Sequence, residues 1–241
     1  IAGSRLRLNQ KPARCRCGAV LSENGNRSRK LGITKRKVLW LIPSLLWVLF
    51  TFWYTDFKGP LTEEEINRGL EQLKTQGWNL GAASKVEQFL RADSGRQFIM
   101  VNSIDLNEAP PSMPGFGDAG SAEQYLDHYM EHMYVQLFKR ASHPIFFGNV
   151  VGRALDVEGI EGVDEWNTAG LIRYRSRRSF LAVLTHPDMR KRHQYKIAAM
   201  TKTIAYPVEP TINLGDPRVL LAMLMGLTAA ILDILLFGRR R

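Results

Sequence analysis

The chain has 241 residues and a formal net charge of +10, and 45% of its residues are hydrophobic, which excludes a wholly disordered or fibrous protein and suits one medium domain with appendages or two small domains. Residues 1–37 carry eleven Lys or Arg and one acid, residues 239–241 carry three Arg, and the part between them carries 19 basic and 22 acidic residues. Because nucleic-acid-binding proteins usually carry positive charge on a folded face, this distribution argues against nucleic acid as a partner.

The basic segment 1–37 is predicted to be a cytoplasmic tail that contacts anionic lipid headgroups or an acidic partner subunit. It holds both cysteines of the chain, Cys15 and Cys17. A four-ligand metal site would need partners that this tail lacks, so we expect free thiols and no disulfide framework in the rest of the chain.

Residues 38–54, VLWLIPSLLWVLFTFWY, are predicted to form a first transmembrane helix, with aromatic residues at both ends where membrane interfaces favour them. A buried core helix, kinked at Pro43, is one alternative. A signal peptide is another, but the apolar run exceeds the usual length and no small-residue cleavage site follows it. The sequence therefore favours an uncleaved anchor.

Residues 219–237, VLLAMLMGLTAAILDILLF, form the apolar part of a second predicted span, which we place at 218–238. At about 1.5 Å per residue, this segment is long enough to cross a hydrocarbon core of about 30 Å. A buried core helix is again the alternative.

Basic residues beside the two spans set the expected topology, because the positive-inside rule places both termini in the cytoplasm. Residues 55–217 then lie on the opposite side, which is the periplasm for a bacterial inner membrane. The residues that set this topology and could contact headgroups or a partner are Lys35, Arg36, Lys37, Arg239, Arg240 and Arg241.

The second predicted span carries a row of small residues, Ala222, Gly226 and Ala230, that would let another helix approach closely. Asp233 follows near the same face. A carboxylate inside a membrane usually faces protein and has a partner, although this one could also reach the headgroups at the end of the helix. Residues 35–37 are expected at the same level, so an ion pair between one of them and Asp233 is reasonable.

Residues 55–95 are predicted to be a helical linker. Thr62 and Glu65 form a capping box that opens a helix over 62–76. Ile66, Leu70 and Leu73 share one face of this helix. A shorter helix is expected over 84–92.

The segment 96–208 is predicted to be an α+β domain of the ferredoxin-like type, because its elements follow the order βαββαβ. A Pro- and Gly-rich loop, 107–120, precedes the first helix, which a second capping box, Ser121 with Gln124, opens. The second helix is broken at Pro187, and residues 209–217 link the domain to the second span. The expected strands are 96–106, 144–159, 165–175 and 201–210, and the expected helices begin at Ser121 and Ser176.

Several short motifs in this domain form a recurring pattern. The motifs are Asn102 in FIMVNSI, Gly148 and Gly152 in the second strand, Trp166 with Asn167, Tyr174 with Ser176 and Arg177, and His186-Pro187-Asp188. Over residues 96–208 the chain resembles a family of small, functionally uncharacterised domains in the dimeric α+β barrel superfamily. The resemblance implies a ferredoxin-like fold and a homodimer that pairs two sheets. Its relatives include oxygenases, isomerases, haem enzymes and binding modules, so the resemblance does not imply one activity.

A polar pocket between helix and sheet is one candidate site, suited to a small acid or to proton transfer. Its candidate residues are His193, Arg173, Tyr125, Asn102 and Trp166. The alternative, which the sequence favours, is that Arg173 and its neighbours Arg175, Arg177 and Arg178 form a solvated or partner-facing edge.

A metal site is a second candidate, because His128 and His132 lie four residues apart on one predicted helix. Asp127 and Glu131 repeat this spacing, and His143 or His193 would have to supply a third ligand. Histidines in this setting are more often solvated or hydrogen-bonded, so we expect neither a metal nor a cofactor.

These features favour a non-catalytic accessory or assembly subunit of a larger integral membrane complex, with a respiratory or photosynthetic assembly as the expected kind. The expected partners are other membrane subunits and anionic lipid headgroups. The alternative is a membrane-anchored enzyme or small-molecule-binding module that uses the polar pocket.

Overall fold

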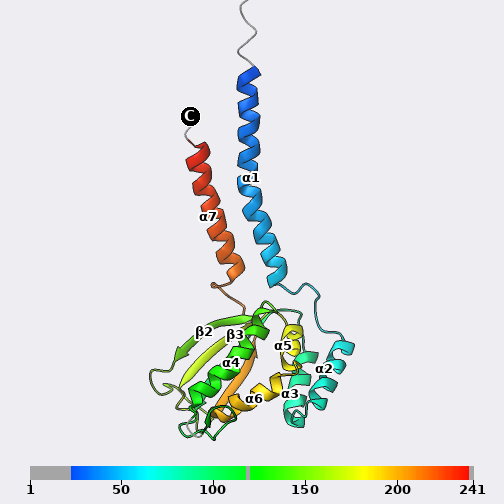
Figure 1. Ribbon diagram of the computed structural model, residues 1–241, viewed down its shortest axis with the longest axis vertical. Helices are drawn as coiled ribbons and strands as arrows, with labels where there is room; N and C mark the ends of the chain where they lie inside the picture. Colours follow the sequence, from blue (N-terminus) through cyan, green and yellow to red (C-terminus); the bar gives the residue numbers. More distant parts are fainter. Residues whose placement is uncertain (1–22, 118–119, 239–241) are drawn as a thin grey trace, which may run out of the picture. The chain divides into compact units, whose positions relative to one another are not determined.

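The computed structural model describes residues 23–117 and 120–238 (Figure 1). The predictions on Cys15, Cys17 and Arg239–Arg241 lie outside these residues. The described residues divide into two compact units, one formed by residues 23–46 together with 222–238 and the other lying within residues 47–221.

Two long apolar helices, α1 (Glu23–Tyr54) and α7 (Pro217–Phe237), include the segments predicted as spans. By length and composition alone, Lys35–Tyr54 and Pro217–Phe237 could each cross a membrane, with hydropathies of 1.5 and 2.5. The helix α1 begins at Glu23, well before the predicted boundary at residue 38.

Helices α2 (Glu63–Thr75) and α3 (Leu80–Arg91) follow α1. The capping box of α2 is confirmed: the Thr62 side chain accepts from the Glu65 N–H, and the Glu65 side chain accepts from the Thr62 N–H. The helix α3 begins four residues earlier than predicted, because the side chain of Asn79 accepts from the Gly81 N–H and caps it there.

A four-stranded antiparallel sheet in the order β2-β3-β1-β4 forms the centre of the 47–221 unit. Helix α4 follows β1, and helices α5 and α6 lie between β3 and β4 (Figure 1). This order confirms the α+β class and is consistent with a ferredoxin-like fold. The element bounds are β1 Phe98–Leu106, α4 Ala122–Phe138, β2 His143–Asn149, β3 Thr168–Tyr174, α5 Arg177–Leu184, α6 Met189–Ala198 and β4 Met200–Val208.

Local signals in the sequence account for the helix boundaries of this unit. The capping box of Ser121 and Gln124 is present at the start of α4. The break at Pro187 separates α5 from α6, since proline cannot donate the backbone hydrogen bond that a continuous helix requires.

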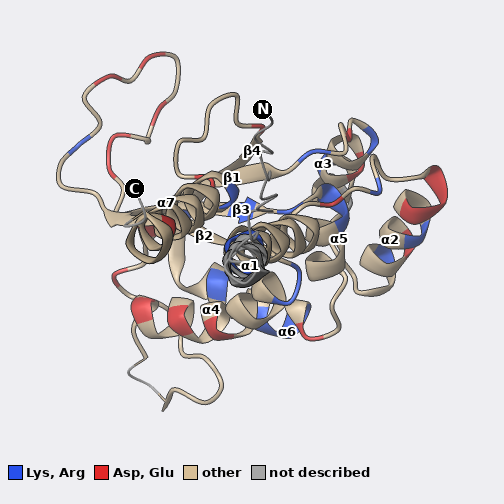
Figure 2. Cartoon of the chain, turned by 90° about the horizontal axis from the view of Figure 1, so that it is seen from above, with Lys and Arg blue, Asp and Glu red and all other residues tan. Residues whose placement is uncertain are grey.

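The connection between β2 and β3, residues 150–167, is longer than predicted. The sequence placed strands over 144–159 and 165–175, but β2 ends at Asn149 and β3 begins at Thr168. Val150 still bonds to Asn167 and Ala154 to Asp164, so pairing continues irregularly. Acidic residues populate the connection (Figure 2), and Val151 and Leu155 are fully exposed, so no buried face holds a regular strand here.

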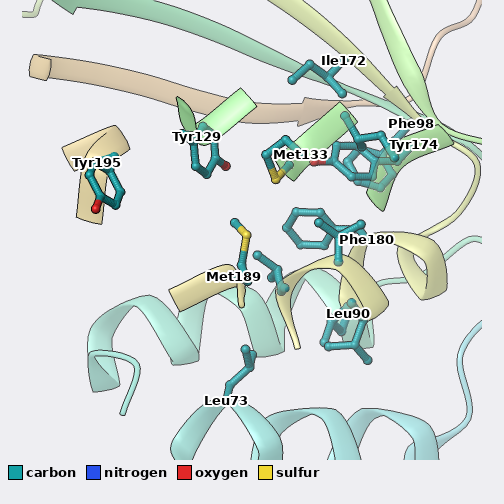
Figure 3. Packing of buried hydrophobic residues seen from close by; sticks show 14 of the residues in the cluster. Leu73, Leu90, Phe98, Tyr129, Met133, Ile172, Tyr174, Phe180, Met189 and Tyr195 are labelled. Carbon is teal, nitrogen blue, oxygen red and sulfur yellow. The ribbon is translucent and has the colours of Figure 1, made fainter. Parts of the chain in front are cut away.

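The hydrophobic core lies between the sheet and the helices (Figure 3). The rings of Phe98 and Tyr174 stack with centroids 5.1 Å apart, and Phe180 of α5 meets both edge-on. Leu73 and Leu90 bring α2 and α3 into the same core. Residues of the segment 55–95 are therefore part of the folded unit. The predicted domain boundary at residue 95 falls inside this unit.

Candidate functional site

A cavity of about 400 Å³ lies between the sheet and helices α4, α5 and α6. Alternation along the strands places Met100, Asn102 and Ile104 of β1 on its wall, together with Ile172 and Tyr174 of β3. Methionines and aromatic side chains from the helices complete the wall. Its volume and apolar lining are typical of small-molecule sites.

Nine side chains with polar atoms line this cavity: Trp78, Asn102, Asp127, Tyr129, Tyr134, Thr168, Tyr174, His193 and Lys196. Asn102 is buried in β1, where its side-chain nitrogen donates to the carbonyls of Met100 and Gly170, at 3.1 and 3.4 Å. These bonds hold the amide against the sheet. Burial raises the pKa of the Tyr129 phenol, which therefore stays protonated at neutral pH.

His193 and Lys196 lie three residues apart on α6 and point to the same cavity. Burial, helped by the charge of Lys196, lowers the pKa of His193 to about 4, so its imidazole is neutral at pH 7. Burial also lowers the pKa of Lys196. Among the described residues, Nδ1 of His193 is buried and has no hydrogen-bond partner.

This arrangement suits an apolar ligand that ends in an acidic or carbonyl group. The Lys196 amine approaches the Tyr129 ring, with Nζ 5.9 Å from its centroid, and it could pair with a carboxylate of such a ligand. A desolvated lysine is also the kind of amine that forms Schiff bases with carbonyl substrates. The sequence prediction did not include Lys196 or Tyr129.

Of the five pocket candidates, the structure brings only His193 and Asn102 to this cavity. The predictions for Arg173, Tyr125 and Trp166 are wrong in this respect. Tyr125 is fully buried beside the cavity, where its hydroxyl donates to the Pro111 carbonyl at 3.0 Å. Trp166 precedes β3, and Lys202 Nζ lies 5.1 Å from its ring centroid.

Arg173 points to the opposite face of the sheet, because its neighbours Ile172 and Tyr174 face the cavity. It is 1% exposed and donates to the carbonyl oxygens of Tyr54 and Ala141, at 3.0 and 2.7 Å. Burial lowers its pKa to about 10, so it stays charged at neutral pH.

The sequence favoured a solvated or partner-facing edge formed by Arg173 and its neighbours, and two of these neighbours form ion pairs within the domain. Arg177 is buried and pairs with Glu209 at 3.0 Å. Arg178 pairs with Asp56 and Glu65, at 3.2 and 2.7 Å. These ion pairs join the start of α5 to the segments on either side of the domain.

The two histidines proposed for a metal have other neighbours. Arg192 Nη1 lies 2.8 Å from Nε2 of His128, and the ring of His132 lies 5.1 Å from that of His186. In residues 23–117 and 120–238, His, Cys, Asp and Glu form no group of three or more that could hold a metal. The third-ligand candidate His143 instead pairs through Nε2 with the Tyr54 hydroxyl, at 2.6 Å.

Within the unit that contains residues 222–238, Asp233 accepts a hydrogen bond from Arg36, with Nη2 and Oδ2 2.6 Å apart. Its side of α7 also carries Met225 and Ala229, and Ala229 is 3% exposed. A Cβ added at Gly226 would meet nothing within 4 Å. Within this unit, α7 therefore contacts α1 most closely through the side that carries Ala229, and not through the row of Ala222, Gly226 and Ala230.

No protein-family model matches the sequence, and a search of curated proteins finds no match. Solved structures that match part of the chain include a protein of unknown function from Rhodopseudomonas palustris, at 14% identity and a TM-score of 0.45, covering 56% of this chain and 96% of that chain. A protein from Arabidopsis thaliana matches at 14% identity and a TM-score of 0.30, covering 48% and 97%.

A dimeric ferredoxin-like protein of unknown function from Thermobifida fusca matches at 15% identity and a TM-score of 0.29, covering 47% of this chain and 91% of that chain. At such scores the ferredoxin-like assignment rests on strand order and pairing. Membership of the family that the sequence resembles stays a prediction.

Proposed function

We propose that the chain is a two-span membrane protein that serves as an accessory or assembly subunit of a larger integral membrane complex. The surface of α1 and α7 supports the two spans, because large apolar side chains such as Leu41 and Met223 are 64% and 67% exposed along them. Such surfaces are unfavourable in water and stable against lipid or other helices. In this proposal both termini are cytoplasmic and residues 55–217 are periplasmic, in a bacterial inner membrane.

The observation that carries the partner role is the sheet face opposite helices α4–α6, which we call the open sheet face. Val101 lies opposite Leu171 and Tyr206 in the neighbouring strands, and Leu171 lies opposite Phe146. Residues directly opposite each other in a sheet share a face. The apolar members of the open sheet face are Ile99, Val101, Phe146, Leu171, Ile204, Tyr206 and Val208.

All four strands contribute apolar side chains to this face, beside the polar residues Ser103, Asp105, Arg173 and Lys202. Phe146 and Tyr206 are each 50% exposed. Contiguous apolar surface of this kind marks a protein contact more often than it marks a solvated face. The fully exposed Val151 and Leu155 add further apolar surface in the connection that follows β2. We propose that another subunit of the complex covers the open sheet face, with a second copy of the chain as the alternative occupant.

Purification in a mild detergent followed by mass analysis tests this proposal. We expect stoichiometric partner subunits with the wild-type chain and loss of them in Tyr206→Asp. Ile197→Asp is the matched control, because Ile197 is 57% exposed on α6 and lies outside both the cavity and the open sheet face. A homodimer that Tyr206→Asp dissociates would replace the partner subunit by a second copy. A monomer in both samples would contradict the role of this face.

Respiratory and photosynthetic assemblies are the first complexes in which to seek the partners. Co-purified redox cofactors would be visible as absorbance bands that the chain alone cannot supply. Partner subunits without such bands would direct the assignment to another membrane complex.

The cavity with His193 and Lys196 favours a second candidate function, the binding of a small apolar acid or carbonyl compound. We expect native mass spectrometry of the purified chain to detect a bound compound that Lys196→Met releases. Ile197→Asp is again a suitable control, because it changes the exposed side of the same helix. A compound retained equally by Lys196→Met would exclude the proposed role of the amine.

A further inference from the structure

Four arginines line a second cavity, of about 600 Å³, in the 47–221 unit. Arg96 precedes β1, and Arg173 lies near the end of β3. Arg175 follows β3, and Arg218 lies in the first turn of α7. The residue after α1, Thr55, lines the same cavity. The site therefore adjoins the points at which both apolar helices meet the domain.

The fold places two of these arginines at the C-terminal end of α1. Arg173 donates to the Tyr54 carbonyl at 3.0 Å, and Arg175 donates to the Trp53 carbonyl at 3.1 Å. Cations are favourable at a helix C-terminus, where unpaired carbonyl groups carry partial negative charge. The guanidinium of Arg173 also lies over the Tyr54 ring, with Cζ 3.5 Å from its centroid.

Two acids, Asp56 and Glu209, also line the cavity, and both pair with arginines outside it. Asp56 pairs with Arg178 at 3.2 Å, and Glu209 pairs with Arg177 at 3.0 Å. Arg178 also pairs with Glu65, and Arg177 also pairs with Asp93, so each of these two arginines is shared between two acids. Asp56 and Glu209 therefore offset part of the positive charge of the cavity.

Arg218 has its own acid, since it pairs with Asp216 at 2.5 Å. Among the described residues, Arg96, Arg173 and Arg175 form no ion pair. All three hydrogen bonds of Arg173 go to neutral oxygens, of Gln97, Ala141 and Tyr54.

An excess of positive charge thus remains around the cavity, and Arg173, which carries part of it, is only 1% exposed. Buried charges in proteins are usually paired, because an isolated charge is strongly destabilised away from water. Among the described residues, Nε of Arg175 is also buried without a hydrogen-bond partner. Capping of α1 alone leaves both observations unexplained.

We propose that this cavity binds the phosphate group of an anionic ligand, with Arg96, Arg173 and Arg175 as its charged contacts. Planar guanidinium groups match phosphate oxygens and form short, strong hydrogen bonds with them. An anionic phospholipid headgroup is the expected source, and this part rests on the proposed function, because Thr55 and Arg218 adjoin the two proposed spans. Free phosphate has the same chemistry and is the other source.

The test uses the full chain in dodecyl maltoside micelles, with phosphatidylglycerol or phosphatidylcholine added, and measures the midpoint of thermal unfolding. A separate titration with inorganic phosphate measures affinity by calorimetry. The variants are Arg96→Gln and Arg175→Gln, which leave the buried Arg173 in place. Arg68→Gln is the matched control, because it removes the same charge from the exposed side of α2, where Arg68 pairs with Glu64.

We expect phosphatidylglycerol to raise the unfolding midpoint of the wild type and of Arg68→Gln more than phosphatidylcholine does. The rise should be lost in Arg96→Gln and Arg175→Gln, and each change should weaken binding by about ten-fold or more. Phosphate binding with the same dependence on these two arginines, but no response to phosphatidylglycerol, supports the site and assigns it to free phosphate. Equal responses of Arg175→Gln and Arg68→Gln to both ligands would overturn the proposal.

Failure of this proposal is distinct from failure of the proposed function. Retention of partner subunits depends on Tyr206 and the open sheet face, and neither Arg96 nor Arg175 belongs to that face. Partners retained without arginine-dependent binding would remove the phosphate site alone.

Discussion

The guanidinium of Arg36 and the carboxylate of Asp233 lie 2.6 Å apart, from Nη2 to Oδ2, although 197 residues separate them in the chain. The pair joins the first and the last long helix within one compact unit. Asp233 is the more enclosed partner, with 12% of its side chain exposed against 59% for Arg36. The acid in the apolar segment 219–237 thus has its partner within the same chain.

We expect Asp233→Ala and Arg36→Ala each to lower the unfolding temperature of the detergent-solubilised chain by a few degrees. The double variant should unfold at about the same temperature as the less stable of the two single variants, because both changes remove the same interaction. Exchange of the charges, Arg36→Asp with Asp233→Arg, should restore part of the loss. Additive single effects in a thermal unfolding series would argue against the pair.

Arg178 should make stability depend on acid pH through Glu65. The hydrogen bond from Arg178 lowers the pKa of Glu65 from 4.5 to about 2. The carboxylate is therefore stabilised by folding above pH 4.5, and this contribution is lost as the pH falls toward 2. Both groups are partly solvated, so we expect Arg178→Gln to cost roughly 1 kcal/mol at pH 7. Denaturant unfolding at several pH values should show the difference from the wild type shrinking below pH 4.5.

His193 should make stability depend on pH in a higher range than Glu65 does. Its pKa falls from 6.5 to about 4 on folding, so the unfolded chain binds the proton first as the pH decreases. Above pH 6.5 the imidazole is neutral in both the folded and the unfolded chain, so it does not change the free energy of unfolding with pH. Between pH 6.5 and 4 the free energy of unfolding decreases, by at most about 3 kcal/mol. His193→Gln should remove this loss from the denaturant unfolding curves. An unchanged slope in that variant would assign the pH dependence to another group.

Leu73→Ala should destabilise the whole 47–221 unit, because Leu73 of α2 is 0% exposed in the common core. Truncation of a buried leucine typically costs about 2–5 kcal/mol. Leu214→Ala is the matched control: Leu214 is 86% exposed, and its change should stay within about 0.5 kcal/mol. Unfolding of α2 separate from the sheet, seen as a second transition, would restore the earlier boundary at residue 95.

Local signals predicted most of the secondary structure. The two capping boxes, the break at Pro187 and the βαββαβ order depend on neighbours in the sequence, and the structure contains all of them. The error in the connection 150–167 has a physical origin. Its valines and leucine have the composition of a strand, but only a buried face could hold them in one, and Val151 and Leu155 have none.

The candidate site was predicted less well, because it depends on which face of each strand meets the helices. Arg173 was assigned to the cavity, yet its neighbours Ile172 and Tyr174 already alternate with it as apolar residues. That alternation places Arg173 on the other face. The spacing of Met189, His193 and Lys196 is that of one helix face and could have identified the lysine.

Gln97 links the two points at which the chain enters and leaves its folded domain. Its Oε1 accepts from Nε of Arg173 at 2.8 Å and from Nη2 of Arg218 at 3.3 Å. Arg173 bonds to the last residue of α1, Tyr54, whereas Arg218 belongs to the first turn of α7 and also bonds to Thr55. Within the 47–221 unit, the two helix ends therefore share one amide oxygen, and a change at Gln97 removes hydrogen bonds from both sides at once.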